Sequence, residues 1–320
     1  MATAEQIKLL IQSHFEKNDD RFKTVVLQLA AYEAKQGHTS LARDIRALID
    51  KAKSESAKVI PLNKDLGEMI SSSISENRLS ELVVKDDIKA RVERILKEFR
   101  LQDKLKKYGM NNRRKILLAG PPGTGKTMTA SVLAGELHLP LCTIMVDKLV
   151  TKYMGETSAK LRQIFETIAE TQAVYLFDEF DAIGSERSMD NDVGEMRRVL
   201  NSFLQFIEQD QSQSVIVAAT NNLRLLDQAL FRRFDDVLHY GLPGEVEIER
   251  LIKNRLNGFI NSNFKIKEIV EKCMSLSHAE IARACDDAIK EAILSDKKTV
   301  DKELLTLMIA ERNSVYQRGE

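Results

Sequence analysis

The chain has 320 residues, of which 43% are hydrophobic and 30% are charged, and its 48 basic side chains balance its 48 acidic ones. A chain of this length and composition suits two or three compact globular units rather than one. The balanced charge excludes a global field for nucleic acid or membrane surfaces, although it leaves room for a local basic channel.

The cysteines and the apolar runs indicate the cellular compartment of the protein. Cys142, Cys273 and Cys285 are odd in number and show no C-x-x-C spacing. They are typical of reduced thiols in a cytoplasmic protein rather than of a disulfide or zinc framework. No run approaches the roughly 18–20 apolar residues that a membrane span needs, and residues 1–20 lack the apolar core of a signal peptide. We therefore expect a cytoplasmic protein without a transmembrane segment.

The N-terminal part predicts a small helical domain followed by a linker. Apolar residues recur at helical spacing through residues 1–53, with a break at Gly37, which predicts three short helices. We interpret this unit as an adaptor domain that docks a partner or substrate. Residues 54–78 are rich in Ser, with Pro61 and Gly67, and predict a linker.

The centre of the chain predicts an α/β domain over residues 79–242. Short apolar runs alternate there with helical patterns, which favours a parallel sheet flanked by helices on both faces. The strand candidates are Lys115–Ala119, Pro140–Val146, Ala173–Phe177, Ser214–Ala219 and Val237–Tyr240. Residues 243–320 have helical patterns only, at about 245–257, 265–275, 278–294 and 301–312, and predict an all-α lid.

Residues Gly120–Thr127 match the phosphate-binding pattern G-x-x-x-x-G-K-[ST] in full, between a predicted strand and a predicted helix. The glycines let backbone N–H groups turn toward phosphate oxygens at the positive end of the helix dipole. Lys126 would reach the β- and γ-phosphates, and the hydroxyl of Thr127 would hold Mg²⁺. The alternative is a glycine-rich turn that binds nothing. The predicted ATP-binding residues are Gly120, Pro121, Pro122, Gly123, Thr124, Gly125, Lys126, Thr127 and Met128.

Polar residues at two strand ends complete a hydrolytic site. Asp178 and Glu179 end the third predicted strand, where Asp178 can hold Mg²⁺ through water and Glu179 can activate the attacking water. Asn221 ends the fourth strand and can bond the γ-phosphate or that water, although on its own it would more often form a turn. Acidic strand ends are common, so this interpretation depends on the phosphate loop nearby.

Arg232 and Arg233 precede the fifth predicted strand, far along the chain from the phosphate loop. Two adjacent arginines can simply be solvated charge. Their position at the domain edge also suits an arginine finger that a neighbouring subunit offers to the γ-phosphate.

Together these motifs resemble the AAA ATPase family in order and spacing: Gly120–Thr127, Asp178–Glu179, Ala219–Asn221 and Arg232–Asp235. Residues 152–165 are similar to the first pore loop and following helix of substrate-threading members, and Ser277–Ile281 resembles the start of the lid helix. The resemblance covers roughly Leu79–Ile309. It implies that Asp178 supports the metal, Glu179 activates water and Asn221 is the first sensor.

The resemblance also implies roles that depart in part from the family pattern. Arg232 and Arg233 would act in trans, but they are adjacent here, so which one is the principal finger stays open. The start of the lid helix has His278 where a second-sensor arginine is sought, and whether His278 or Arg283 contacts the nucleotide stays open. Tyr153, with Lys152 and Met154, would grip a polypeptide in a central pore, although a buried aromatic or a base-stacking loop is an alternative.

We therefore expect a Mg-dependent ATPase that works as a homo-oligomer, a hexameric ring, and remodels, unfolds or disassembles a protein client. It would serve a separate effector or protease, because the chain has neither an H-E-x-x-H nor a G-x-S-x-G motif. A nucleic-acid motor and a slow ATP-dependent switch or scaffold are the alternatives. Nucleic acid is the less favoured partner because the chain has neutral charge and no basic aromatic-rich patch.

Overall fold

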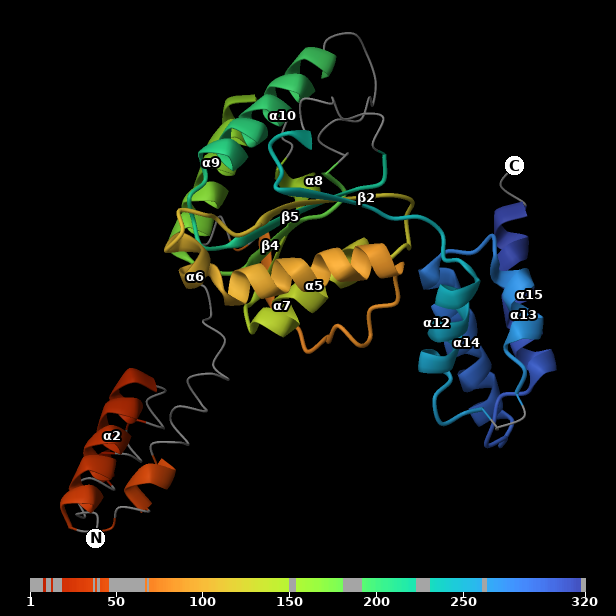
Figure 1. Cartoon of the computed structure of the whole chain (residues 1–320), viewed down its shortest axis with the longest axis horizontal. Helices are drawn as coiled ribbons and strands as arrows, with labels where there is room; N and C mark the ends of the chain where they lie inside the picture. Colours follow the sequence, from red (N-terminus) through yellow and green to blue (C-terminus); the bar gives the residue numbers. More distant parts are fainter. Residues whose placement is uncertain are drawn as a thin grey trace. The chain divides into compact units, whose positions relative to one another are not determined.

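The computed structural model describes residues 8–9, 13, 19–36, 38, 41–45, 67, 69–149, 154–180, 192–222, 231–260 and 264–317. The chain divides into two compact units, Met1–Val59 and Ile60–Glu320 (Figure 1). None of the helices within these ranges is long and apolar enough to cross a membrane.

Most described residues of the first unit are helical. Helix α2 (Asp19–Lys35) buries Val25 and Ala30, and residues 41–45 form a further helical segment. Just beyond α2, Nδ1 of His38 lies 2.7 Å from Oε2 of the buried Glu33, and this contact lowers the pKa of Glu33. Residues 8–9 and 13 are also helical, and the remainder of the expected three-helix unit lies outside the described residues.

The second unit contains a sheet with the strand order β1-β3-β4-β5-β2-β6. Its strands are β1 (Ile70–Ser73), β2 (Lys115–Ala119), β3 (Leu141–Ile144), β4 (Val174–Phe177), β5 (Val215–Thr220) and β6 (Asp236–His239). All neighbouring pairs are parallel except β1 and β3. Ala119 of β2 lies opposite both Thr220 of β5 and His239 of β6, so the carboxyl ends of these strands meet at one edge.

Helices cover both faces of this sheet (Figure 1). Helices α9 (Met154–Glu170) and α10 (Asp192–Gln209) pack on one face, and α5 (Asp86–Arg100) and α7 (Lys126–Leu137) pack on the other. Strand residues alternate between the two cores: Tyr175 and Phe177 join the first, and Val174 and Leu176 join the second. Strands buried on both faces need continuous apolar runs, which explains the composition of β2, β4 and β5.

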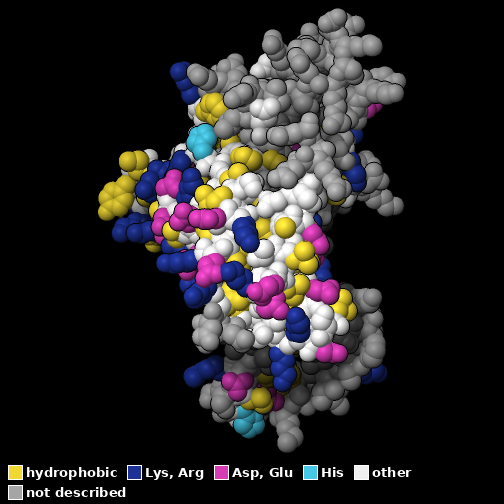
Figure 2. Space-filling model, turned by 90° about the vertical axis from the view of Figure 1, so that its right-hand side faces the viewer, with side chains coloured by type: hydrophobic (Ala, Val, Ile, Leu, Met, Phe, Trp, Pro, Cys, Tyr) yellow, Lys and Arg dark blue, Asp and Glu magenta, His cyan; other side chains and the backbone are white. Residues whose placement is uncertain are grey.

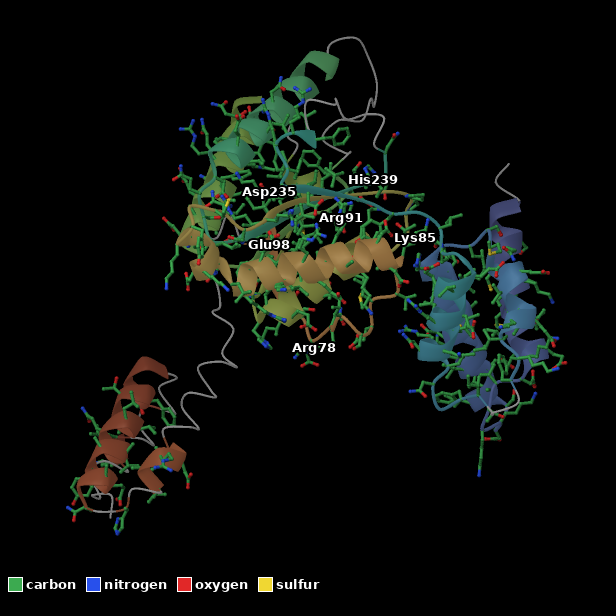
Figure 3. The ribbon with its side chains drawn as sticks, in the orientation of Figure 1. Arg78, Lys85, Arg91, Glu98, Asp235 and His239 are labelled. Carbon is green, nitrogen blue, oxygen red and sulfur yellow. The ribbon has the colours of Figure 1, made fainter. Side chains whose placement is uncertain are left out.

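Short helices and ion pairs complete this layer. Helix α6 (Gln102–Lys106) follows α5, and α8 (Val146–Leu149) follows β3. Arg91 and Glu98 project from α5 toward neighbouring segments (Figure 3). Arg91 forms an ion pair with Asp236 of β6, and Glu98 accepts a hydrogen bond from Nη1 of Arg113 at 2.5 Å. These contacts anchor α5 to the edge strand and to the start of β2.

The C-terminal helices form a core of their own. They are α12 (Glu245–Arg255), α13 (Lys267–Cys273), α14 (His278–Leu294) and α15 (Lys302–Gln317). Ile252, Ile269, Ala288 and Leu305 are fully buried among them. Helix α14 begins with Ser277 as its cap, since the Ser277 hydroxyl accepts a hydrogen bond from the N–H of Glu280 at 3.3 Å. The C-terminal region is therefore helical where it is described, as the sequence predicts for the proposed lid, and α14 starts and ends at the predicted residues.

The linker predicted over residues 54–78 contains a strand that the sequence does not predict. Ile70–Ser73 forms β1, antiparallel to β3, with Ile70 buried and the three serines exposed. Serine-rich sequence does not signal a strand; the unpaired edge of β3 supplies the hydrogen-bond partners. The next residues cross α7, where Arg78 donates to the carbonyl of Gly135 at 2.9 Å (Figure 3).

Other element boundaries shift by a few residues. The predicted strand over 140–146 ends at Ile144, because Val146 already begins α8. The strands predicted at 214–219 and 237–240 are displaced by one residue, to Val215–Thr220 and Asp236–His239. Ends of elements depend on tertiary pairing more than on local composition.

Candidate active site

The phosphate loop joins β2 to α7, and close packing requires two of its glycines. Gly120 has a φ of 153°, and a Cβ there would lie 2.3 Å from the carbonyl oxygen of Tyr240, the residue that follows β6. Gly123 has a φ of 73°, and a Cβ there would lie 2.5 Å from the hydroxyl oxygen of Ser277. Only glycine fits such contacts. The loop is therefore packed between Tyr240, which follows β6, and Ser277, which precedes α14.

Lys126 lies within this loop with only 6% of its surface exposed. Its ammonium group donates hydrogen bonds to the carbonyls of Gly120 at 2.7 Å and Pro121 at 2.8 Å, and to Oδ1 of Asn221 at 2.8 Å. The structure thus brings together the loop lysine and the polar residue that follows β5. The charge of Lys126 therefore lies beside the loop backbone that the pattern associates with phosphate oxygens.

The hydroxyl of Thr127 donates a hydrogen bond to Oδ2 of Asp178 at 2.8 Å. Thr127 lies in the first turn of α7 and Asp178 follows β4, so the two predicted metal-binding residues converge from different elements. A hydroxyl and a carboxylate are oxygen ligands of the type that Mg²⁺ prefers. These residues fit a magnesium ion bound beside the phosphate loop.

Glu179 has a φ of 50°, in the left-handed region that non-glycine residues seldom adopt. Such a conformation costs roughly 1–2 kcal/mol. Its N–H donates to Oδ1 of Asp178 at 3.0 Å, which holds the turn. The exposed Glu179 therefore follows β4 in a strained turn, and strain of this kind is concentrated at functional positions.

A buried hydroxyl pair supports the base of the loop. The phenol oxygen of Tyr240 lies 2.6 Å from the hydroxyl oxygen of Thr129, which bonds the carbonyl of Gly125 at 3.0 Å. Burial raises the pKa of Tyr240, so the phenol stays protonated. Sequence reasoning missed this pair, since its members are 111 positions apart and belong to no motif.

The lid touches the loop directly. The N–H of Ala279, in the first turn of α14, donates to the carbonyl of Gly123 at 3.0 Å. Of the two residues considered as nucleotide contacts, Arg283 forms an ion pair with Glu280 at 3.0 Å on its own helix. Both ring nitrogens of His278 are buried and have no hydrogen-bond partner among the described residues.

The two adjacent arginines differ in their surroundings. Arg233 lies 3.5 Å from the exposed carboxylate of Glu208 on α10. Arg232 is exposed and forms no ion pair with any described residue. Phe234, next in the chain, is buried and anchors the segment to the core. The predicted pore residues Lys152 and Tyr153 lie outside the described residues, and Met154 begins α9.

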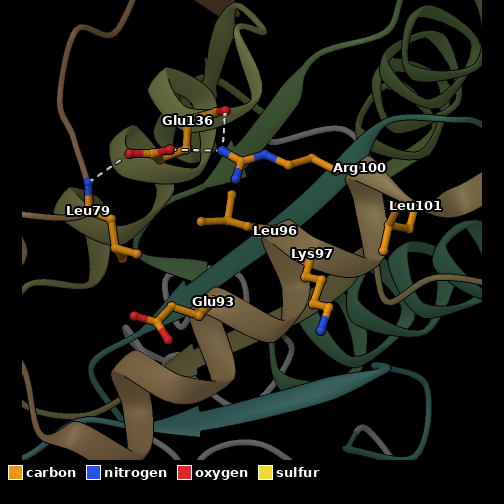
Figure 4. A pocket seen from close by; sticks show the side chains of 7 residues that line it. All are labelled: Leu79, Glu93, Leu96, Lys97, Arg100, Leu101 and Glu136. Carbon is orange, nitrogen blue, oxygen red and sulfur yellow. Dashed lines mark hydrogen bonds and ion pairs between the residues drawn. The ribbon is translucent and has the colours of Figure 1, made fainter.

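A separate hollow of about 420 Å³ lies between α5, α7 and the segment at Leu79 (Figure 4). Glu136 crosses its rim, accepting hydrogen bonds from the N–H of Leu79 at 3.1 Å and from Arg100 at 2.8 Å. None of the predicted site residues lines it, so it is not part of the phosphate site.

The parallel sheet, the loop after β2 and the polar strand ends together define a P-loop nucleoside triphosphatase. Residues 116–242 match the model of the "ATPase family associated with various cellular activities (AAA)". The chain is 33% identical over 309 residues to the uncharacterised AAA family ATPase y4kL of Sinorhizobium fredii, covering 94% of this chain and 93% of the relative. The chain therefore belongs to the AAA ATPase family, and its activity is ATP hydrolysis.

Two further relatives carry functional names. A putative 26S proteasome regulatory subunit homologue of Methanothermobacter thermautotrophicus is 29% identical over 276 residues, covering 84% of this chain and 73% of the relative. The ATP-dependent zinc metalloprotease FtsH 2 of a Thermoanaerobacter species is 32% identical over 209 residues, covering 63% of this chain and 40% of that protein.

Proposed function

We propose that this chain hydrolyses Mg-ATP within a hexameric ring of identical subunits and uses the free energy to remodel, unfold or disassemble a protein client. One observation carries the hydrolytic part: the Thr127–Asp178 and Lys126–Asn221 hydrogen bonds bring the phosphate loop and two strand ends to one edge of the sheet.

Each residue has a separate task in this proposal. Lys126 and the loop N–H groups bind the β- and γ-phosphates, while Thr127 and Asp178 hold the magnesium ion, which neutralises charge on the phosphates. Glu179 accepts a proton from the attacking water, which adds to the γ-phosphorus as the bond to the β–γ bridging oxygen breaks. Asn221 orients this water or the γ-phosphate.

The proposed ring supplies the remaining positive charge in trans. Arg232 is our principal candidate for the finger, because it is exposed and not engaged by a described carboxylate, whereas Arg233 has Glu208 nearby. An exposed ion pair is weak, so Arg233 remains available as a second contact. A group that acts on a neighbour's phosphate must be free to leave its own subunit.

Two observations support the proposal of a protein client: the names of the similar proteins and the distribution of charge on the surface. A proteasome regulatory subunit homologue and an ATP-dependent protease are both among the similar proteins. Tyr153 and its neighbours are the proposed grip on a polypeptide, and a separate protease or other effector would receive it. Basic and acidic side chains are interspersed on the described part of the face in Figure 2, which favours a protein over a nucleic acid.

The client class is tested by measuring phosphate release with an unfolded protein, with single-stranded DNA or RNA, and with no addition. Stimulation by the unfolded protein, lost in Tyr153→Ala with the basal rate kept, supports remodelling. Stimulation by nucleic acid alone supports a nucleic-acid motor. No stimulation by either supports the slow switch or scaffold. The hexamer is tested by light scattering of Glu179→Gln with Mg-ATP; a monomer under these conditions contradicts the ring.

The finger is tested by mixing. Arg232→Ala subunits mixed with Glu179→Gln subunits should regain hydrolysis that each variant alone lacks, because an Arg232→Ala subunit keeps its own Glu179 and receives Arg232 from a Glu179→Gln neighbour. Arg233→Ala alone is the matched comparison and should lower the rate less than Arg232→Ala alone. A mixture as inactive as the two single variants contradicts action in trans.

A further inference from the structure

Tyr240 contacts both ends of the phosphate loop. Its N–H donates to the carbonyl of Ala119 at 2.7 Å, and its carbonyl oxygen is the atom that leaves no room for a Cβ on Gly120. Its phenol oxygen lies 2.6 Å from the hydroxyl oxygen of Thr129, in the first turn of α7. One buried residue therefore meets the start of the loop through its backbone and reaches the end of the loop through its side chain.

The direction of the hydrogen bonds between these groups follows from the hydrogens available. The hydroxyl of Thr129 has one hydrogen, which it donates to the carbonyl of Gly125 at 3.0 Å. Tyr240 must therefore be the donor to Thr129. The phenol keeps its hydrogen at neutral pH, because burial raises the pKa of Tyr240. The hydrogen bonds run from Tyr240 to Thr129 and on to Gly125, and bonds in such a chain strengthen one another.

The carbonyl at the end of this chain belongs to the peptide unit that joins Gly125 to Lys126. Gly125 has a φ of 101°, and glycine by itself permits several orientations of that unit. The carbonyl also accepts a hydrogen bond from the N–H of Thr129 at 2.9 Å, so two donors fix its direction. Because a trans peptide unit is planar, its N–H points away from its carbonyl. Fixing the carbonyl of Gly125 therefore directs the N–H of Lys126 to the N-terminal end of α7, where the loop pattern binds phosphate.

We infer that Tyr240 is a positioning residue for the phosphates of ATP: its hydroxyl acts through Thr129 to hold the Gly125–Lys126 peptide unit in the orientation that binds them. The inference rests on the proposed role of the loop in binding ATP. It predicts that removing one buried hydroxyl outside the loop weakens every ligand that binds through its phosphates.

Tyr175 provides a matched control for a purely structural role. Its ring is also buried, on β4, and its phenol donates to the backbone carbonyls of Thr167 at 3.3 Å and Thr171 at 3.0 Å. Both carbonyls lie at the C-terminal end of α9 rather than in the phosphate loop. Phenylalanine at either tyrosine removes one buried hydroxyl and keeps the ring, so both substitutions should lower stability. Only the substitution at Tyr240 should also weaken phosphate binding.

The test measures the dissociation constants of ATP and of inorganic tripolyphosphate for the full-length protein by calorimetry, and its stability by urea unfolding. Tyr240→Phe should raise both dissociation constants by the same factor, about fivefold, since both ligands bind through phosphates. Tyr175→Phe should lower the urea midpoint without changing either constant. Thr129→Val should weaken both ligands as well. The double variant, Tyr240→Phe with Thr129→Val, should bind no more weakly than Thr129→Val alone, because the phenol acts through Thr129.

Three results would overturn the inference: unchanged dissociation constants in Tyr240→Phe, a loss for ATP without one for tripolyphosphate, and additive losses in the double variant. Lys126→Ala separates these results from a failure of the site itself. It should weaken both ligands whatever Tyr240 does; if it weakens neither, the proposed phosphate site is wrong. Should Tyr240→Phe fail to fold, Thr129→Val is compared with Thr129→Ser, which keeps the hydroxyl. Equal constants for those two variants also overturn the inference.

Discussion

The ammonium group of Lys126 donates a hydrogen bond to the side-chain oxygen of Asn221 at 2.8 Å. The two residues are 95 positions apart and meet because β2 and β5 are parallel neighbours. A phosphate oxygen carries more negative charge than an amide oxygen, so a bound triphosphate would compete with Asn221 for this ammonium group. Asn221 would then be available to the γ-phosphate or to water.

Replacing Asn221 by alanine should therefore affect turnover more than binding. We expect the dissociation constant of ATP to stay within about threefold, and the turnover number to fall about 100-fold, the scale for losing one transition-state hydrogen bond. Nucleotide titration and steady-state phosphate release measure the two quantities. Asn222→Ala, at the next exposed position, is the control. A normal turnover number in Asn221→Ala would show that the residue does not act in the reaction.

Asp178→Asn should change the requirement for magnesium. The amide keeps the shape of the side chain and can still contact Thr127, but it removes the negative charge that favours the cation. We expect the Mg²⁺ concentration for half-maximal activity to rise about 10- to 100-fold. Asp103→Asn, on the exposed surface of α6, should leave the magnesium curve unchanged. Superimposable curves for Asp178→Asn and wild type would contradict the metal assignment.

Gly123 and Gly109 offer a matched pair of substitutions. Their φ angles are 73° and 71°, so alanine costs roughly 1–2 kcal/mol of backbone strain at either position. A Cβ at Gly109 meets open space, whereas one at Gly123 lies 2.5 Å from Ser277 and 3.1 Å from Ala279. Gly123→Ala should therefore weaken ATP binding and destabilise the protein more than Gly109→Ala. Urea unfolding measures the stability and ATP titration measures the binding. Equal effects of the two substitutions would mean that the start of α14 moves away from residue 123 without a cost in free energy.

Gly135→Ala should destabilise the protein, although glycine to alanine in a helix normally stabilises by about 1 kcal/mol. The added Cβ would lie 2.2 Å from the carbonyl oxygen of Asn77, in the segment that crosses α7. Forcing that segment away should cost about 1–3 kcal/mol in the free energy of unfolding. Asn254→Ala, on the exposed side of α12, should be neutral or slightly stabilising. A stabilised Gly135→Ala would show that the crossing segment moves freely.

The cysteines should be unreactive in the folded protein. Burial raises the pKa of Cys142 to about 11, and that of Cys273 and Cys285 to about 12. At pH 8 less than about 1% of each thiol is the reactive thiolate, and reagents also lack access. We expect a thiol reagent to label none of them in native buffer and all three in denaturant. Rapid labelling under native conditions would place at least one thiol at the surface.

Much of the second unit can be predicted from the sequence because its signals are local. The phosphate-loop pattern lies within eight consecutive residues, and buried parallel strands appear as continuous apolar runs before polar ends. Asp178 and Asn221 could be assigned to one edge because carboxyl ends of parallel strands meet there. The limits of α14 were also predictable, since Ser277 is a strong helix cap.

Other contacts have no local signature. Ile70–Ser73 becomes a strand only because β3 offers an unpaired edge, and Asn77 meets Gly135 only because the chain then crosses α7. Likewise, no pattern links Tyr240 to Thr129, or Gly123 to Ser277. Which residues share a strand, a loop or a helix follows from local propensity and periodicity. Which of these elements lie against the phosphate loop depends on long-range packing, and that was decided by the tertiary structure.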